Sequence, residues 1–194
     1  MGRSSVIEMK ERSFIESSMS VYRRFRHLMP SLLTTNLAAR RPLLVAPPAA
    51  KLLLDTLERT RAETGMVLLA YVLMPDHVHL VTAPSATCSL SRFMQLFKGR
   101  FSREWNARCG AAGSVWRSRF DERALTNEES LLRAIEYVHW NPVKAGLSVC
   151  PEEHPWSSAA GMDRPCVALL ADYLGLGQAE ACPPSEITTH RHPG

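Results

Sequence analysis

The apolar residues of this chain change their spacing several times along the sequence, and the order of these changes limits the folds that it can adopt. A spacing of three to four residues predicts an amphipathic helix, whereas alternation or a short apolar run predicts a strand. The longest helical pattern covers Ser89–Cys109 and is followed by Gly110 and Gly113. Because its apolar side chains recur on one side, we expect this helix to pack against another layer of the domain. These side chains are Leu90, Phe93, Met94, Phe97, Phe101 and Trp105.

Two further helices are predicted, one on each side of this segment. Lys51–Glu63 has helical spacing and ends just before a glycine that is suited to a C-terminal cap. The later helix begins at Thr126, which matches a capping box with Glu129. We expect that helix to end at about Trp140, because Pro142 disfavours helical geometry in the residue before it.

Four segments are predicted as strands. The second and third are separated only by Pro75-Asp76, which are turn residues, so these two strands form a hairpin. The last segment alternates more loosely than the others. The four segments are Leu32–Leu37, Met66–Met74, His77–Val81 and Val115–Ala124.

The predicted order is therefore strand, helix, strand, strand, helix, strand, helix. This order suits an α+β domain with a four-stranded antiparallel sheet of the ferredoxin-like or RRM-like kind. We expect the helices to pack mainly on one face of that sheet, which leaves the other face free for a ligand. The expected domain covers residues 22–176, between a flexible extension at 1–21 and a flexible tail at 177–194.

Composition narrows the class of protein. An apolar content of 45% and a charged content of 22% are ordinary for a globular domain. The five cysteines are scattered and never form a CxxC pair, so neither a disulfide framework nor a zinc finger is predicted. The sequence shows no secretory signal and no apolar stretch long enough to span a bilayer. We therefore expect a cytoplasmic protein that does not associate with membranes.

Basic residues are concentrated in one part of the chain. The window Arg92–Arg123 holds eight basic and three acidic residues, so its charge of +5 exceeds the +4 of the whole chain. Arginine predominates there, and its planar guanidinium makes forked contacts with phosphate. This pattern favours a polyanionic partner. A solvated helix face is the alternative interpretation.

A His-x-His pair lies in the second arm of the predicted hairpin. Because side chains alternate across a strand, His77 and His79 point to the same face and Val78 to the other. Two adjacent imidazoles are suited to binding a metal ion. Histidines with a purely structural role remain the alternative.

The predicted last helix places a phenol and an amide together. Tyr137 and Asn141 are four residues apart and differ by about 40° around the helix, so they share a face. His139 lies roughly 200° from Tyr137 and is expected to point elsewhere. The alternative is that Tyr137 only packs its ring on the sheet.

Four motifs in this order resemble the REP-associated tyrosine transposases, which belong to the single-tyrosine HUH transposases, also called IS200-like. The similarity covers about residues 22–174. One departure is the first strand, SLLTTNL, which lacks the aromatic residues that are usual there. The four motifs are YVLMPDHVHLV at 71–81, VWRSRFDE at 115–122, YVHWNPVKAGL at 137–147 and HPWSSA at 154–159.

The resemblance implies a function as well as a fold. Members of this family bind single-stranded DNA beside an imperfect hairpin, and they nick and rejoin it through a 5′-phosphotyrosine intermediate. By position, Tyr137 is the nucleophile on the C-terminal helix, and His77, His79 and Asn141 are the ligands of a divalent metal ion, Mg or Mn. No nucleotide cofactor is implied, and the active form is a monomer or a homodimer.

The basic window supplies the candidates for DNA contact. Arginine and lysine side chains would hold backbone phosphates, and Trp116 would stack on a base, with a core position as the alternative for this tryptophan. The candidates are Lys98, Arg100, Arg103, Trp116, Arg117 and Arg119.

Other functions fit less well. A histidine-triad hydrolase needs a third histidine, and a phosphoesterase with paired His-x-Thr motifs needs a threonine, where this chain has Val81. The main alternative is a non-catalytic RRM-like nucleic-acid-binding protein, or a domesticated transposase that binds hairpin DNA without cleaving it.

Overall fold

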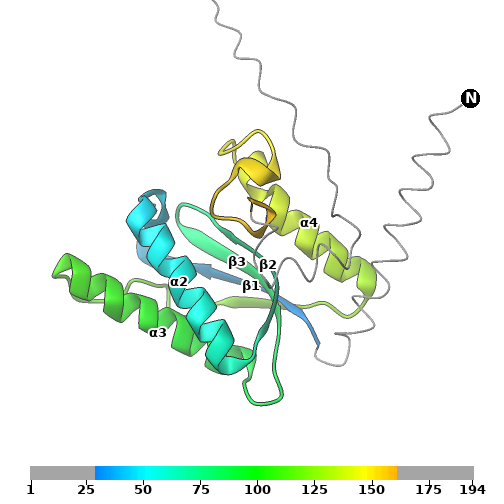
Figure 1. Cartoon of the computed structure of the whole chain (residues 1–194), viewed down its shortest axis with the longest axis horizontal. Helices are drawn as coiled ribbons and strands as arrows, with labels where there is room; N and C mark the ends of the chain where they lie inside the picture. Colours follow the sequence, from blue (N-terminus) through cyan, green and yellow to red (C-terminus); the bar gives the residue numbers. More distant parts are fainter. Residues whose placement is uncertain (1–28, 161–194) are drawn as a thin grey trace, which may run out of the picture.

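The computed structural model describes residues 29–160, so the predicted extension at 1–21, the tail at 177–194 and both ends of the predicted domain lie outside the described residues. The described part contains a four-stranded antiparallel sheet with the strand order β2-β3-β1-β4, as Figure 1 shows. This is the ferredoxin-like arrangement, and it confirms the predicted fold class. The strands are β1 Ser31–Asn36, β2 Val67–Leu73, β3 His77–Ala83 and β4 Asp121–Ala124.

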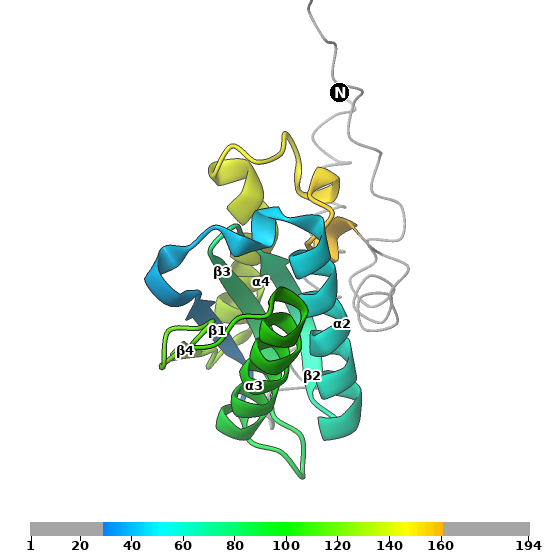
Figure 2. The same cartoon turned by 90° about the vertical axis from the view of Figure 1, so that its left-hand side faces the viewer.

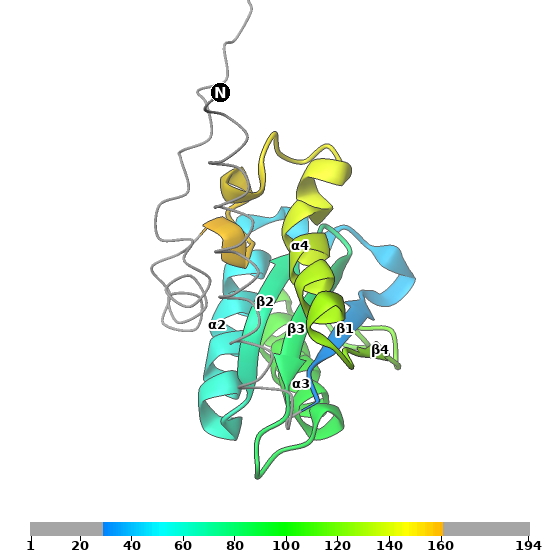
Figure 3. The ribbon, with the colours of Figure 1, turned by 90° about the vertical axis from the view of Figure 1, so that its right-hand side faces the viewer.

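Three α-helices cover the sheet: α2 Pro47–Thr64, α3 Leu90–Cys109 and α4 Glu128–Lys144. Helices α2 and α3 lie side by side on one face (Figure 2), and α4 crosses the opposite face (Figure 3). Short 3₁₀ helices at Ala38–Arg40, Leu43–Val45, Pro151–Glu153 and Ser158–Ala160 complete the described chain.

The two faces have separate apolar cores. On the α2/α3 face, the stripe of α3 that was predicted from its spacing is buried against the sheet, including Phe93, Phe97 and Phe101. On the other face, α4 buries its own stripe, which includes Leu131 and Val138. The expectation of a free second face is therefore wrong, because the last helix also has an apolar side that must leave water.

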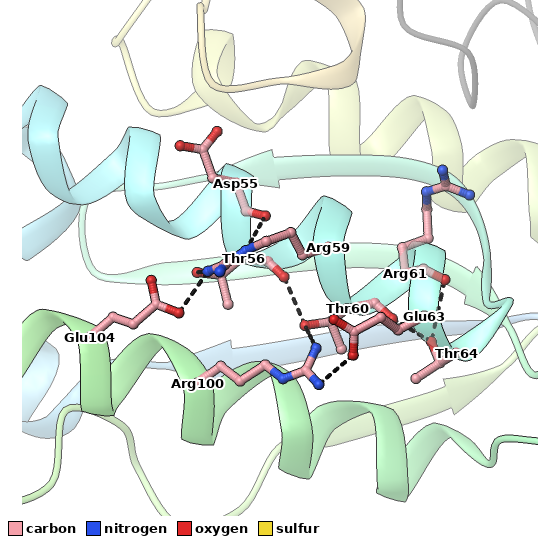
Figure 4. A network of polar contacts seen from close by, with 9 residues as sticks. All are labelled: Asp55, Thr56, Arg59, Thr60, Arg61, Glu63, Thr64, Arg100 and Glu104. Carbon is pink, nitrogen blue, oxygen red and sulfur yellow. Dashed lines mark hydrogen bonds and ion pairs between the residues drawn. The ribbon is translucent and has the colours of Figure 1, made fainter.

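Polar contacts join α2 to α3, as Figure 4 shows. Arg59 pairs with Glu104 at 2.6 Å, and Arg100 pairs with Glu63 at 2.5 Å. Arg100 also donates to the hydroxyl of Thr60 at 3.3 Å, so its guanidinium bridges two helices. Exposed pairs of this kind contribute little stability each, but they fix the relative position of the helices. No helix in residues 29–160 is both long and apolar enough to cross a bilayer.

Helix α4 differs from the prediction at both ends. Its N-cap is Asn127, whose side chain accepts a hydrogen bond from the backbone N–H of Ser130 at 2.8 Å, so the capping box lies one residue later than the predicted one at Thr126. The helix also continues beyond Trp140 to Lys144, with Pro142 inside it. Proline removes only one backbone donor, and later bonds such as the N–H of Ala145 to the carbonyl of Asn141 hold the last turn.

The last strand is shorter than predicted. Only Asp121–Ala124 pairs with β1, whereas Trp116 makes an isolated bridge to Leu37 and turns its ring into the core between Phe97 and Phe101. The predicted start at Val115 is therefore wrong, because packing of this tryptophan against α3 overrides the local strand pattern.

Candidate active site

The two histidines of β3 lie on the face of the sheet that α4 crosses. In the register between β1 and β3, His79 is opposite Thr34 and His77 is opposite Asn36. The two imidazole centroids are 4.8 Å apart, with the rings at 84° to each other. The prediction that both rings share a face is confirmed.

Each imidazole has a hydrogen-bond partner at its Nδ1 atom. The Nδ1 of His79 lies 2.8 Å from the hydroxyl oxygen of Thr34. The Nδ1 of His77 lies 2.5 Å from one carboxylate oxygen of Asp76. The other carboxylate oxygen of Asp76 accepts from Arg40 at 3.3 Å. Burial raises the pKa of Asp76, but the hydrogen bonds and charges of His77 and Arg40 outweigh this and lower it overall.

The other nitrogen of His79 has no partner. This side chain is 5% exposed, and its Nε2 atom is buried without a hydrogen bond within the described structure. Burial, together with the nearby charge of His77, lowers the pKa of His79 to about 4, so the ring is neutral at physiological pH. A neutral imidazole with an unshared Nε2 is the form that binds a metal ion.

Tyr137 lies directly beside this pair. The centroid of its ring is 5.3 Å from that of His79, with the rings at 72° to each other in an edge-on contact. The side chain is 39% exposed, so its ring contacts the site while part of it remains open to solvent. The Nζ atom of Lys144 lies 5.8 Å from the centre of the same ring, so a cation is present beside the phenol.

Asn141 follows Tyr137 by one turn of α4 and is half-buried. Continuation of the helix through Pro142 keeps this residue in helical geometry, so it stays on the side of α4 that carries Tyr137. Its side-chain amide has no hydrogen-bond partner among residues 29–160. The same range contains no group of three or more His, Cys, Asp or Glu side chains that could hold a metal ion. A metal site here would therefore consist of two imidazoles and an amide oxygen, which is a chemically suitable set of nitrogen and oxygen donors.

A groove of about 780 Å³ opens beside Tyr137, between the exposed strand β4 and the first turns of α4. Charged groups of both signs line it beside apolar surface. The groove is lined by Leu32, Thr34, Asp121, Glu122, Arg123, Ala124, Asn127, Glu129, Ser130, Arg133 and Tyr137.

The predicted DNA-contact residues are not all equally available. Trp116 is 4% exposed and its indole N–H donates to the carbonyl of Lys98 at 3.2 Å, so it is a core residue and the predicted stacking role for it is wrong. The ammonium of Lys98 donates to the carbonyl of Arg117 at 2.7 Å, and burial lowers the pKa of Lys98. Arg100 is held between α2 and α3.

The remaining predicted contacts are Arg103, Arg117 and Arg119, which are exposed and form no ion pair within the described part of the chain. Arg103 lies on α3, which covers the face of the sheet opposite the histidine pair. The backbone N–H of Arg117 donates to the carbonyl of Asn36, the residue opposite His77, so this segment follows the end of β1 near the site. Arg117 therefore lies closer to the histidine pair than Arg103 does.

The motif HPWSSA closes the outer edge of β2. The hydroxyl oxygen of Ser158 accepts from the backbone N–H of Tyr71 at 3.0 Å and lies 2.8 Å from the Nε2 of His139 on α4. His154 contacts the carbonyl of Leu73 through its Nε2 at 2.9 Å. These contacts tie α4 to the sheet, and they confirm that His139 points away from Tyr137.

Three residues of this region were not predicted from the sequence: Thr34, Asp76 and the exposed aromatic Trp140, which is 42% exposed one turn from Tyr137. Asp76 was identified only as a turn residue, and Thr34 only as a strand residue. Their place at the histidines depends on the register between β1 and β3, for which the sequence carries no local signal.

Comparison with known proteins assigns the family. The chain matches the family model described as IS200-like transposase over residues 32–141, which is more than half of its length, and it belongs to that family. It is 27% identical over 142 residues to the REP-associated tyrosine transposase of Escherichia coli strain K12, which covers 72% of this chain and 82% of the relative.

Two further similarities agree with this. A putative REP-associated tyrosine transposase of Haemophilus influenzae is 25% identical over 99 residues, covering 46% of this chain and 56% of that relative, so the match spans about half of its length. The solved structure of a REP-associated tyrosine transposase bound to a REP hairpin superposes with a TM-score of 0.58 at 24% identity, covering 72% of this chain and 84% of that one. That likeness shows a shared fold.

Proposed function

We propose that this protein is a metal-dependent, transposase-like enzyme that cuts and joins single-stranded DNA at hairpin-flanked sites through a 5′-phosphotyrosine intermediate. The observation that carries the proposal is the contact between Tyr137 and His79, with ring centroids 5.3 Å apart. It places the phenol of α4 beside an imidazole pair in which the Nε2 of His79 has no hydrogen-bond partner in the described structure and could bind a cation.

Hairpin DNA is supported as the substrate by the relatives. One solved structure with the same fold is that of a REP-associated tyrosine transposase bound to a REP hairpin. Because this chain belongs to the same family, we propose hairpin DNA as its substrate too. Arg117, exposed beside the end of β1, is the best placed of the predicted residues to hold a backbone phosphate, and the exposed Arg119 follows it two residues later.

His77, His79 and Asn141 would hold a divalent ion, magnesium or manganese. The ion would supply Lewis acidity, polarising a phosphodiester and neutralising charge in the transition state. The fit rests on the buried Nε2 of His79, which lacks any partner in the described structure. A site of imidazoles alone would favour zinc. The amide oxygen of Asn141 would make the site suitable for magnesium or manganese, which prefer oxygen ligands.

The chain's own residues carry out the bond changes. The phenol oxygen of Tyr137 attacks the phosphorus, its proton passes to solvent, and the bond from phosphorus to the 3′-oxygen breaks. The 5′-phosphate of the downstream strand is then bonded to Tyr137, and the departing 3′-oxygen of the upstream strand takes up a proton from solvent and becomes a 3′-hydroxyl. Because the phosphodiester energy is retained in the phosphotyrosine, attack by a 3′-hydroxyl reverses the step and joins strands without a nucleotide cofactor. Lys144, close to the phenol ring, would stabilise negative charge there.

The proposal is tested with a labelled single-stranded hairpin oligonucleotide, manganese and a denaturing gel. We expect a protein–DNA adduct with the full-length chain and none with Tyr137→Phe or in the presence of EDTA. DNA that is retarded on a native gel but never cut by the wild-type protein, over a range of hairpins and metal ions, would instead identify a non-catalytic hairpin-binding protein.

A further inference from the structure

We infer that Thr34 and Asp76 are positioning residues that hold the imidazoles of His79 and His77 in the tautomer with a protonated Nδ1 and a free Nε2. This inference rests on the proposed function, because it concerns how the metal ligands are prepared. It assigns a role to two residues that belong to neither the histidine pair nor the tyrosine helix.

The contact of Thr34 is imposed by the sheet. Thr34 and His79 are directly opposite each other in the register between β1 and β3, so their side chains are held on the same face. The threonine oxygen lies 2.8 Å from Nδ1 of His79. In a β-branched residue of a strand, the rotation about the Cα–Cβ bond is restricted, so the hydroxyl has little freedom to leave that position.

The contact with the Asp76 carboxylate determines the tautomer of His77. An ionised carboxylate can only accept hydrogen bonds, so the Nδ1 of His77, 2.5 Å away, must carry the hydrogen. Arg40 donates to the other carboxylate oxygen at 3.3 Å and orients it. The neutral form of His77 with this arrangement leaves Nε2 with a lone pair.

The state of Nε2 in His79 makes the assignment specific. This atom is buried and has no hydrogen-bond partner in residues 29–160. If Thr34 donated its proton to Nδ1, then Nε2 would carry a hydrogen, and a buried donor would face no acceptor. If Thr34 accepts, Nε2 keeps a lone pair, which a cation can use. Outer hydrogen bonds of this kind commonly fix the ring orientation of metal-binding histidines.

The neighbouring residue Thr35 provides a matched control. It is buried on the α2/α3 face of the same strand, opposite Val78, and its hydroxyl has no hydrogen-bond partner in the described structure. Thr34→Val and Thr35→Val therefore make the same chemical change one residue apart, and only the first removes a contact to a histidine.

The first measurement is a long-range ¹H–¹⁵N correlation spectrum of the full-length, metal-free protein. We expect both histidines to show a pyrrole-like Nδ1 and a pyridine-like Nε2. In Thr34→Val, the pattern of His79 should become that of a mixed or inverted tautomer, while Thr34→Ser keeps the wild-type pattern. A wild-type His79 with a protonated Nε2 would overturn the inference.

The second measurement is a manganese titration followed by electron paramagnetic resonance, without DNA. The manganese affinity should fall about 10- to 100-fold in Thr34→Val and in Asp76→Ala. It should be restored in Thr34→Ser and unchanged in Thr35→Val, and thermal melts establish that each variant is folded. Equal affinity in Thr34→Val and wild type would also overturn the inference.

These readouts separate the inference from the proposed function. If the spectra and the manganese titration behave as expected but no hairpin is ever cleaved, the positioning role stands and the proposed activity fails. If cleavage occurs but the Thr34 and Thr35 variants are indistinguishable in both measurements, the activity stands and the positioning role fails.

Discussion

Two histidines, the buried His79 beneath α4 and the half-buried His139 on it, differ in a way that distinguishes the candidate site from the rest of the fold. Burial lowers the pKa of each to about 4, with the charge of His77 adding to the effect at His79. The Nε2 of His139 lies 2.8 Å from the hydroxyl of Ser158, whereas the Nε2 of His79 has no partner in the described structure. A lowered pKa therefore occurs both in a structural and in a candidate catalytic histidine.

The neighbours of the two rings explain the difference. His139 joins α4 to the segment that closes the edge of β2, and its hydrogen bond completes that structure. His79 lies between Thr34, His77 and the ring of Tyr137, and its free nitrogen remains available. The candidate site is distinguished by a buried imidazole nitrogen of His79 that lacks a hydrogen bond beside the phenol of Tyr137.

The largest effect is expected from Tyr137→Phe. This change removes the proposed nucleophilic oxygen, so formation of the covalent adduct should fall by roughly a thousandfold or more. Because the side chain is partly exposed and has no buried hydrogen bond, the free energy of unfolding should change by less than about 0.5 kcal/mol. Gel assays of the adduct and thermal melts measure both quantities. Adduct formation by the variant would mean that another residue is the nucleophile.

The next prediction replaces each of the two histidines with glutamine in turn. His79→Gln should weaken manganese binding at least about 100-fold, because it would remove a proposed direct ligand. His139→Gln should leave the manganese affinity within about twofold of wild type. Calorimetric titration of both variants measures this. A similar loss in the two proteins would show that the distinction between the histidines is mistaken.

Ser158→Ala tests the structural side of the comparison. The buried hydroxyl of Ser158 interacts with the ring of His139 and with both the N–H and the carbonyl of Tyr71, so its loss should destabilise the fold by about 1–3 kcal/mol. Ser102→Ala is the control, because that hydroxyl only bonds the carbonyl of Lys98 in its own helix, and it should cost less than about 0.5 kcal/mol. Urea unfolding gives both values. If Ser158→Ala and Ser102→Ala lose the same free energy of unfolding, Ser158 has no special role in holding α4.

The smallest effect is a dependence of stability on pH. The pKa of His139 is lowered from about 6.5 when unfolded to about 4 when folded, and the charge of Glu152 opposes this shift. As pH falls below about 6.5, the unfolded chain takes up the proton first, so stability is complete above that pH and decreases toward pH 4. Between pH 7 and pH 5, the free energy of unfolding should decrease in both proteins. The decrease should be smaller in His139→Gln than in wild type, by on the order of 1 kcal/mol. Parallel pH profiles of the two proteins would contradict this assignment.

Much of the fold follows from local sequence patterns. The strand and helix order predicts the ferredoxin-like sheet, and the alternation in β3 correctly places His77 and His79 on one face. The helical spacing correctly separates Tyr137 from His139. The placements of the histidines and of Tyr137 could be predicted because each depends on a single element, and the sheet because it depends only on the order of the elements.

Features that depend on two elements could not be predicted. The apolar stripe of α4 shows that the helix is buried, but not against which face of the sheet. Trp116 and Trp140 are each followed by a polar residue in the sequence, yet the first fills a space between α3 and the sheet and the second is exposed. The metal ligands and the DNA contacts remain predictions, since they involve groups outside the chain.

The segment that follows α4 has a consequence for how this sheet meets other molecules. Pairing of Ser157 with Val72, and of the N–H of Leu73 with the carbonyl of Trp156, occupies the outer side of β2. Within the described residues, the opposite border at β4 is the one whose backbone remains open, and it is short and charged, which discourages the addition of a foreign strand. Since that border also forms one wall of the groove beside Tyr137, nucleic acid lying in the groove would shield it.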